Sequence, residues 1–367
     1  MSRPLLADHL DPDHNSLTLV RLGLAVLVVI SHSFVLATGN RVADPFTAWT
    51  GYSLGDHAVN VFFVLSGIVT TASLLRLGSP ARFLVARALR VVPAVAIFAV
   101  LFALAAAPWV TTKPLAEYFS SRDVMVYILR TASFAPGHPL LPGVFETNPM
   151  AAITNEPLWT VKYEIFCYLA LALAGLIVLR RGRRTEDAAR WLGLGAAVIA
   201  IGHVVTTALV PIALPETAGH LRRFLFCFAL GILAFVLAGR IRLDWRWLAA
   251  LGLLYAATYA TPLRPAVSVV LTGYAALLAA TSAFGPLRAI TNRYDLSYGT
   301  YVFGWPVAQM LMVIVPGLSI AALTGATLAL VLPLALLSWV FVERPALTLK
   351  YHFRRHGSST RQISDAE

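Results

Sequence analysis

The chain has 367 residues, of which 58% are hydrophobic and only 13% are charged. A soluble globular domain carries roughly twice that share of charged residues, so the composition indicates an all-α, polytopic integral membrane protein. The net charge of +11 does not indicate nucleic-acid binding, because the Lys and Arg residues lie mainly in the loops that flank apolar stretches, where lipid headgroups attract them.

Ten apolar stretches are long enough to cross about 30 Å of hydrocarbon as helices. We therefore expect about ten transmembrane helices, at residues 16–37, 57–77, 88–110, 157–179, 190–210, 221–239, 245–261, 264–283, 297–315 and 318–342. If the N-terminus is inside, the inner segments carry about three times as many Lys and Arg residues as the outer ones. Because positive charges are retained in the cytoplasm, both termini are predicted to be cytoplasmic.

A single membrane domain is predicted over residues 1–350, followed by a polar, disordered cytoplasmic tail over residues 351–367. The longest stretch between spans runs from residue 111 to 156 on the outer side. Within it, residues 116–134 have the pattern of one amphipathic interfacial helix, and residues 135–149 contain too many Pro and Gly residues for regular structure. We expect this segment to cover a pocket that opens outward.

The first span contains two polar residues, Arg21 and His32, eleven positions apart. Eleven positions make roughly three helical turns, so both side chains project from the same face, about 16 Å apart along the axis. That separation is close to the reach of a pantetheine arm. An Arg within a span costs roughly 2.5 to 3.5 kcal/mol on insertion scales, so the pair indicates a functional site.

The fourth span adds a carboxylate, Glu164, which is expected a few residues below the outer face, at about the depth of His32. Cys167 and Cys227 each lie in an apolar span, where a free Cys behaves as a small hydrophobic residue. The Cys residues indicate neither a disulfide framework nor a metal site.

Six strings, in order, resemble the acyltransferase-3 family of membrane-bound acyltransferases. Two are the Arg21 and His32 pair itself and the pattern of Arg87, Arg90 and Pro93 before the third span. The other four are AVNVFFVLSG at 58–67, EPLWTVKYEIFCY at 156–168, SYGTYVFGWPV at 297–307 and VERP at 342–345. The family often has Gly and Asp where this chain has Ala58 and Asn60, and often has His at the position of Gly304. A mechanism that needs a second membrane His is therefore not implied.

This resemblance implies a membrane-bound O-acyltransferase of the bacterial inner membrane. It would transfer an acyl group, usually acetyl from acetyl-CoA, to a hydroxyl of a cell-surface polysaccharide, such as O-antigen or exopolysaccharide, or of its lipid-linked precursor. CoA carries several phosphates, and guanidinium groups at Arg87 and Arg90, on adjacent turns, suit their recognition. The pantetheine arm would then pass Arg21 and bring the thioester near His32.

A neutral His can accept the proton of the acceptor hydroxyl near pH 7, so His32 is the predicted catalytic base. Glu164 could orient its imidazole and stabilise the charged form. Direct transfer through one tetrahedral intermediate is favoured, since neither Cys is placed as a nucleophile. Candidates for stabilising the oxyanion are the side chains at Asn60, Ser66, Lys162 and Tyr298.

Simpler explanations exist for several of these residues. Arg21 could extend to the headgroups, and Arg87 and Arg90 could serve topology alone. Glu164 could pair with Lys162, Arg222 or a group on another helix. Trp159 fits the aromatic belt of a membrane interface. Glu343 and Arg344 fit a local ion pair, and Gly67, Gly175 and Gly231 fit close helix packing.

Two other functions are compatible with the sequence. Ten helices with intramembrane charges would suit a transporter of an acyl donor or a lipid-linked sugar. A scaffold subunit of a glycan assembly complex would also suit, and for it a His32→Ala change would leave activity unaffected.

Overall fold

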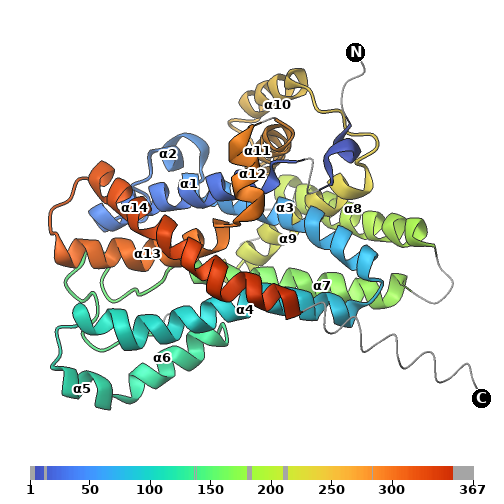
Figure 1. Ribbon diagram of the computed structural model, residues 1–367. Coiled ribbons are helices and arrows are strands. Elements are labelled where there is room, and N and C mark those ends of the chain that lie inside the picture. The colour runs from blue at the N-terminus through green and yellow to red at the C-terminus, as the bar shows by residue number, and fades with distance from the viewer. Residues whose placement is uncertain are drawn as a thin grey trace, which may run out of the picture.

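The computed structural model describes residues 5–11, 15–135, 137, 139–179, 184–209, 214–282 and 284–349. These residues form helices joined by loops, with isolated β-bridges and no strand among them (Figure 1). The predicted all-α class is confirmed. The predicted tail at 351–367 lies outside the described residues.

Each of the ten predicted spans is occupied by a helix. The ten helices are α1 (Leu17–Thr38), α3 (Leu54–Leu77), α4 (Pro80–Leu101), α7 (Val161–Val178), α8 (Thr185–Leu209), α9 (Glu216–Val236), α10 (Trp245–Ala257), α11 (Arg264–Ala280), α13 (Ser297–Ile314) and α14 (Ile320–Ser338). Shorter elements are η1 (Leu6–His9), α2 (Pro45–Thr50), η3 (Phe102–Ala106), η4 (Ala107–Trp109), α5 (Leu115–Ser120), α6 (Arg122–Ala132), η5 (Pro157–Thr160), α12 (Pro286–Arg293) and η6 (Trp339–Glu343).

Seven helical stretches among the described residues are long and apolar enough to cross a membrane, so the chain is a multi-pass membrane protein. They are Leu17–Thr38, Leu54–Leu77, Pro80–Trp109, Pro157–Val178, Thr185–Leu209, Glu216–Val236 and Ile320–Leu349. The helix α10 has 13 residues and would span about 20 Å, short of the hydrocarbon thickness. The count of ten spans and the cytoplasmic termini therefore stay predictions.

The helices α3 and α9 make the closest packing in the bundle, through Gly67 and Gly231. A Cβ at Gly67 would lie 2.3 Å from the carbonyl oxygen of Phe228, and one at Gly231 would lie 2.0 Å from that of Val64. Only glycine allows the two backbones to approach this closely. The predicted packing role of these glycines is confirmed. Both helices pack against α7, and α3 also packs against α1 (Figure 1).

Local capping sets where α3 begins. The Ser53 side chain accepts a hydrogen bond from the backbone N–H of Asp56, and the Asp56 carboxylate accepts one from the backbone N–H of Ser53. This reciprocal pair satisfies two N–H groups that a helix start leaves free. It also fixes Asp56 beside the cavity that His32 lines.

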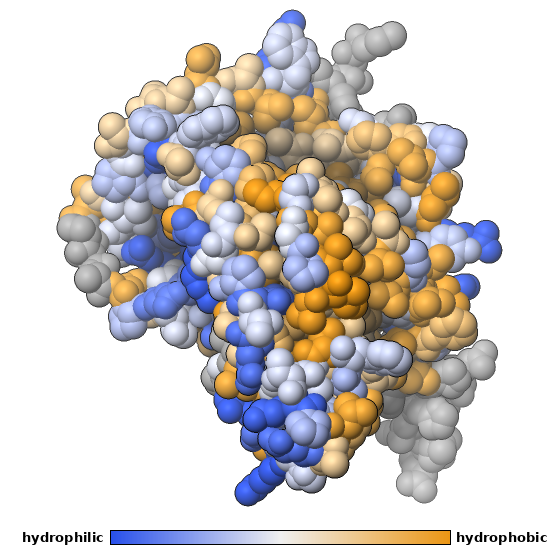
Figure 2. Space-filling view, turned by 90° about the vertical axis from the view of Figure 1, so that its left-hand side faces the viewer, coloured by the Kyte–Doolittle hydropathy of each residue, from blue (hydrophilic) through white to orange (hydrophobic). Residues whose placement is uncertain are grey.

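The long segment between α4 and α7 differs from its prediction. Instead of one helix over 116–134, two helices form, α5 and α6, because the backbone of Ser121 is extended. The Ser121 hydroxyl accepts a hydrogen bond from the N–H of Asp123 at 3.2 Å and so starts a new helix. The helices α5 and α6 lie at the bottom of Figure 1. At the same height, the surface in Figure 2 shows hydrophilic and hydrophobic residues next to one another.

The rest of that segment packs against α13. Asn148 donates to the side-chain oxygen of Gln309 at 2.7 Å, and Gln309 donates to the carbonyl of Met150 at 2.8 Å. The indole N–H of Trp305 donates to the carbonyl of Ile153 at 2.9 Å. Residues 148–153 are thereby held over one end of α13, beside His32, whose ring contacts that of Trp305.

Candidate active site

Two of the predicted arginines share one carboxylate, that of Asp295. Arg21 donates to Asp295 Oδ2 at 2.9 Å, and Arg90 donates to the same oxygen at 2.6 Å. The backbone N–H and the hydroxyl of Ser297 donate to Asp295 Oδ1. Burial alone would raise the pKa of the Asp295 carboxyl, but Arg21, Arg90 and the Ser297 hydrogen bonds together hold this pKa well below its usual range. Asp295 is therefore a fixed counter-charge for α1 and α4.

Arg90 also bridges to the end of the last helix. Its Nη1 donates to Glu343 Oε2 at 3.1 Å, and Glu343 Oε1 accepts a hydrogen bond from Ser338. The sequence suggested a local ion pair between Glu343 and Arg344. In the structure Glu343 pairs instead with Arg90 on α4. The side chains of Arg90 and Glu343 are 12% and 1% exposed, so this pair is shielded from solvent.

Arg87 differs from the other two arginines. Its guanidinium lies 5.9 Å from the centre of the Phe83 ring and 6.0 Å from that of Tyr168. Within the described part of the chain it forms no ion pair, and its Nε is buried without a hydrogen-bond partner. An arginine that lines a cavity and forms no ion pair favours an anion as its ligand.

Arg21, Arg87, Arg90 and Glu164 line one cavity of about 120 Å³, which we call the arginine cavity. Glu164 accepts a hydrogen bond from the hydroxyl of Tyr168, which in turn accepts one from Ser66 at 3.4 Å. The sequence placed Glu164 beside His32, whereas the structure places it with the arginines. Four of the five predicted site residues thus come together.

His32 lines a second cavity of about 140 Å³, here the histidine cavity. Its ring meets that of Trp305 edge to face, with centroids 5.0 Å apart. In the described residues no hydrogen bond reaches either ring nitrogen. Two carboxylates, Asp56 and Glu156, line the same cavity, and Glu156 pairs with Arg41 at 2.6 Å. The ring nitrogens are therefore available for a ligand.

The two cavities adjoin. Val59, Thr160 and Tyr301 line both of them. The hydroxyls of Thr160 and Tyr301 lie 2.6 Å apart, and Tyr301 donates to the carbonyl of Pro157 at 2.9 Å. A long molecule held by the arginines would pass this hydrogen-bonded pair on a direct path to His32.

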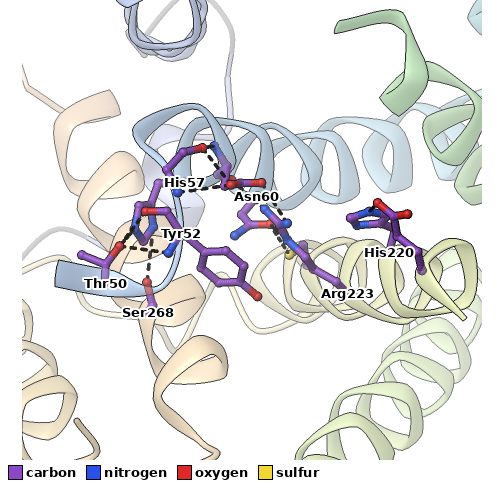
Figure 3. A network of polar contacts seen from close by, with 11 residues as sticks. Thr50, Tyr52, His57, Asn60, His220, Arg223 and Ser268 are labelled. Atoms are coloured by element: carbon purple, nitrogen blue, oxygen red, sulfur yellow. Dashed lines mark hydrogen bonds and ion pairs between the residues drawn. The ribbon is translucent and has the colours of Figure 1, made fainter. Parts of the chain in front are cut away.

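Arg223 holds Asp56 at the edge of the histidine cavity, and sequence reasoning missed it (Figure 3). Arg223 donates to Asp56 Oδ1 at 3.0 Å and to Asn60 Oδ1 at 2.6 Å. Its guanidinium lies over the ring of Tyr52, 4.2 Å from the ring centre. The signal was the four-residue spacing of Asp56 and Asn60 on one helix face, which suits one forked cation.

His57 lies beside Arg223 in Figure 3, and both of its ring nitrogens are within hydrogen-bond distance of a hydroxyl group. Its Nε2 lies 2.8 Å from the hydroxyl of Thr50, and its Nδ1 lies 3.3 Å from that of Ser268 (Figure 3). Of the side chains considered for the oxyanion, Ser66 and Tyr298 line the arginine cavity, Lys162 lines another cavity, and Asn60 is bound to Arg223. Among the described residues, no group of three or more Cys, His, Asp or Glu side chains is placed to hold a metal.

The chain is similar to one family profile and to two proteins over most of its length. A family profile described as an acyltransferase domain matches residues 14–343. An O-acetyl transferase of Shigella phage Sf6 is 27% identical over 344 residues, which cover 91% of this chain and 96% of that protein. Nodulation protein 10 of Rhizobium leguminosarum bv. viciae is 27% identical over 377 residues, covering 94% and 96%. No solved structure matches the chain.

Proposed function

Because the chain belongs to the acyltransferase-3 family and is an acyltransferase, we propose that it moves an acetyl group from acetyl-CoA to a hydroxyl of a bacterial surface polysaccharide or its lipid-linked precursor. The likeness to a phage O-acetyl transferase over nearly the whole of both chains supports the acetyl group and the oxygen acceptor. The protein would act in the inner membrane, with the donor entering from the cytoplasmic side.

The arginine cavity is the proposed donor site. Arg87 would bind a phosphate of CoA, since it is the arginine of this cavity that forms no ion pair within the described residues. Arg21 and Arg90, which Asp295 and Glu343 hold in place, would line the path of the pantetheine arm. Metal chemistry plays no part in this proposal.

His32 is the proposed base. It would take the proton of the acceptor hydroxyl as the oxygen attacks the thioester carbonyl, and give a proton to the CoA sulfur as the tetrahedral intermediate collapses. Its unbonded ring nitrogens are the single observation that carries this assignment. Glu156 lines the same cavity and is better placed than Glu164 to stabilise the imidazolium by its charge.

The proposal is tested in cells. A deletion strain is complemented with wild type, His32→Ala or Arg21→Ala at equal membrane abundance, and the acetyl esters on its surface glycan are measured by NMR. We expect wild type to restore the esters, and His32→Ala to leave them absent. Full restoration by His32→Ala would contradict the assignment of the base. No acetyl change in any strain would instead favour a transporter or a scaffold.

A further inference from the structure

A third cavity, of about 170 Å³, shares a lining residue with the histidine cavity, and the function proposed above does not use it. It lies between α6, the loop before η5 and the start of α7. Trp159 lines both this cavity and the histidine cavity. We call it the lysine cavity, after Lys162. A molecule in it could therefore reach His32 along the Trp159 ring.

Among the described residues, the charged side chains that line the lysine cavity are both cationic. Arg130 and Lys162 line it, and no Asp or Glu is among its described lining residues. The Lys162 ammonium lies 4.9 Å from the centre of the Tyr163 ring and forms no ion pair in the described part of the chain. In contrast, the histidine cavity carries two carboxylates. The lysine cavity thus favours an anionic group.

The walls of the lysine cavity suit a sugar. Asn155 is 6% exposed, its amide nitrogen donates to the carbonyl of Val302 at 2.9 Å, and its Oδ1 is buried with no partner. That oxygen can accept a bond from a ligand hydroxyl. The Trp159 ring packs against those of Tyr163 and Phe224, each with centroids 5.7 Å away, so it is held as a flat platform.

We propose that the lysine cavity binds the acetyl acceptor, a glycan that carries a negative charge, and that Lys162 binds that charge. The inference rests on the transferase function proposed above. In this arrangement the donor and the acceptor occupy different cavities, each of which adjoins the histidine cavity. The acceptor hydroxyl lies over Trp159 and reaches the imidazole, while the anionic group stays beside Lys162 and Arg130.

The test uses the purified full-length protein in nanodiscs, acetyl-CoA, and surface polysaccharide extracted from the deletion strain. Lys162→Gln is expected to raise the KM for polysaccharide about tenfold. It should leave kcat and the KM for acetyl-CoA within about twofold, and Lys162→Arg should restore the KM for polysaccharide. Lys113→Gln is the matched control, because Lys113 lies just before α5, pairs with Glu117 at 3.2 Å and is not among the residues that line the cavity.

Two further acceptors identify the source of the charge. If it is a sugar carboxylate, chemical reduction of the carboxyl groups of the polysaccharide should raise the wild-type KM to that of Lys162→Gln. If it is the phosphate of a lipid carrier, the Lys162 effect should appear with the extracted lipid-linked precursor and not with free polysaccharide.

An equal acceptor KM for wild type and Lys162→Gln, with every acceptor, would overturn the inference and leave the transferase function intact. A fall in kcat or in acetyl-CoA affinity without a change in acceptor KM would also overturn it, because that pattern indicates a structural role. Failure of wild type to acetylate any of these glycans would overturn both proposals.

Discussion

At the scale of single residues, the two histidines at one end of the bundle differ in what their rings bind. Both ring nitrogens of His57 lie within hydrogen-bond distance of a hydroxyl, whereas those of His32 bind nothing in the described residues and face a cavity. A proton acceptor needs a free nitrogen, so the structure separates a candidate base from a structural histidine. The sequence singled out His32 through its spacing from Arg21, but it did not show that hydroxyl groups engage both ring nitrogens of His57.

Arg87 allows a direct test of donor binding. Replacing Arg87 with Gln removes the guanidinium that has no carboxylate partner among the described residues, so acetyl-CoA should bind at least tenfold more weakly. Calorimetric titration of acetyl-CoA into the protein in nanodiscs measures this. Arg82→Gln, at an exposed position on the same helix, is the control and should bind as wild type does. Equal affinity in Arg87→Gln would place the phosphates elsewhere.

Asp295 is expected to matter for stability. Asp295→Asn leaves Arg21 and Arg90 without their shared carboxylate and should cost about 3 kcal/mol of unfolding free energy, the lower end for a broken buried pair because Arg21 is 30% exposed. Thermal unfolding in detergent measures the loss. The matched control is Asp187→Asn, which removes an exposed pair with Arg190 and should cost well under about 1 kcal/mol.

Asp295→Asn should also change how the stability of the protein depends on pH. Because the folded-state pKa of Asp295 is lowered, its contribution is fully present above the unfolded-state pKa of about 3.9 and is lost as the pH falls through the folded-state value. Between about pH 5 and pH 3, wild type should therefore lose more stability than Asp295→Asn. Parallel pH profiles of the two proteins would argue against the pairing.

At the scale of elements, the contact between α3 and α9 depends on two glycines. Gly67→Ala would force a methyl group onto the backbone of α9 and should cost about 1–3 kcal/mol, as overpacking does. Gly202→Ala on α8 meets nothing within 4 Å and should be neutral or slightly stabilising. Thermal melts of the two variants compare the sites, and an unchanged melting temperature for Gly67→Ala would show that the helices separate without cost.

Helix positions were predictable from sequence because long apolar runs indicate spans without any knowledge of partners. The break at Ser121 was not predicted, since the amphipathic pattern of 116–134 continues through it and only the capping bond reveals it. The grouping of Arg21, Arg87 and Arg90 followed from motif order. The carboxylate of Asp295, which lies in a loop more than 200 residues after Arg90, could not be paired with them from spacing.

Helix geometry alone did not predict which cavity Glu164 lines. Its depth along α7 was estimated from span ends, but the cavity that a side chain lines depends on which face its helix turns inward. Glu164 faces Tyr168 and the arginines, while Glu156, in a loop, lines the cavity of His32. Gly304, where the family often has His, faces α1, and a Cβ there would lie 2.8 Å from Val29.

At the scale of the whole molecule, transfer from cytoplasmic acetyl-CoA requires a fixed orientation, with the arginine end in the cytoplasm and the His32 end outside. Cys167 and Cys227 are buried, so a new surface Cys can be labelled selectively. Ser120→Cys should react with a membrane-impermeant maleimide in intact cells, and Arg76→Cys should react only after permeabilisation. The opposite labelling pattern would invert the topology and place the donor site on the wrong side.

Three adjoining cavities then define a path through the protein, with a cationic site for the donor, His32 in the middle and a cationic site for the acceptor. The pair formed by Thr160 and Tyr301 separates the first two. Transfer along this path depends on His32 as the group that moves the proton.

The most direct measurement is the single-turnover rate of acetyl transfer from radiolabelled acetyl-CoA to the polysaccharide, in proteoliposomes. We expect His32→Gln to lower this rate by about 100- to 10,000-fold without weakening acetyl-CoA binding, while His57→Gln stays within about threefold of wild type. A wild-type rate in His32→Gln would show that His32 does not move the proton.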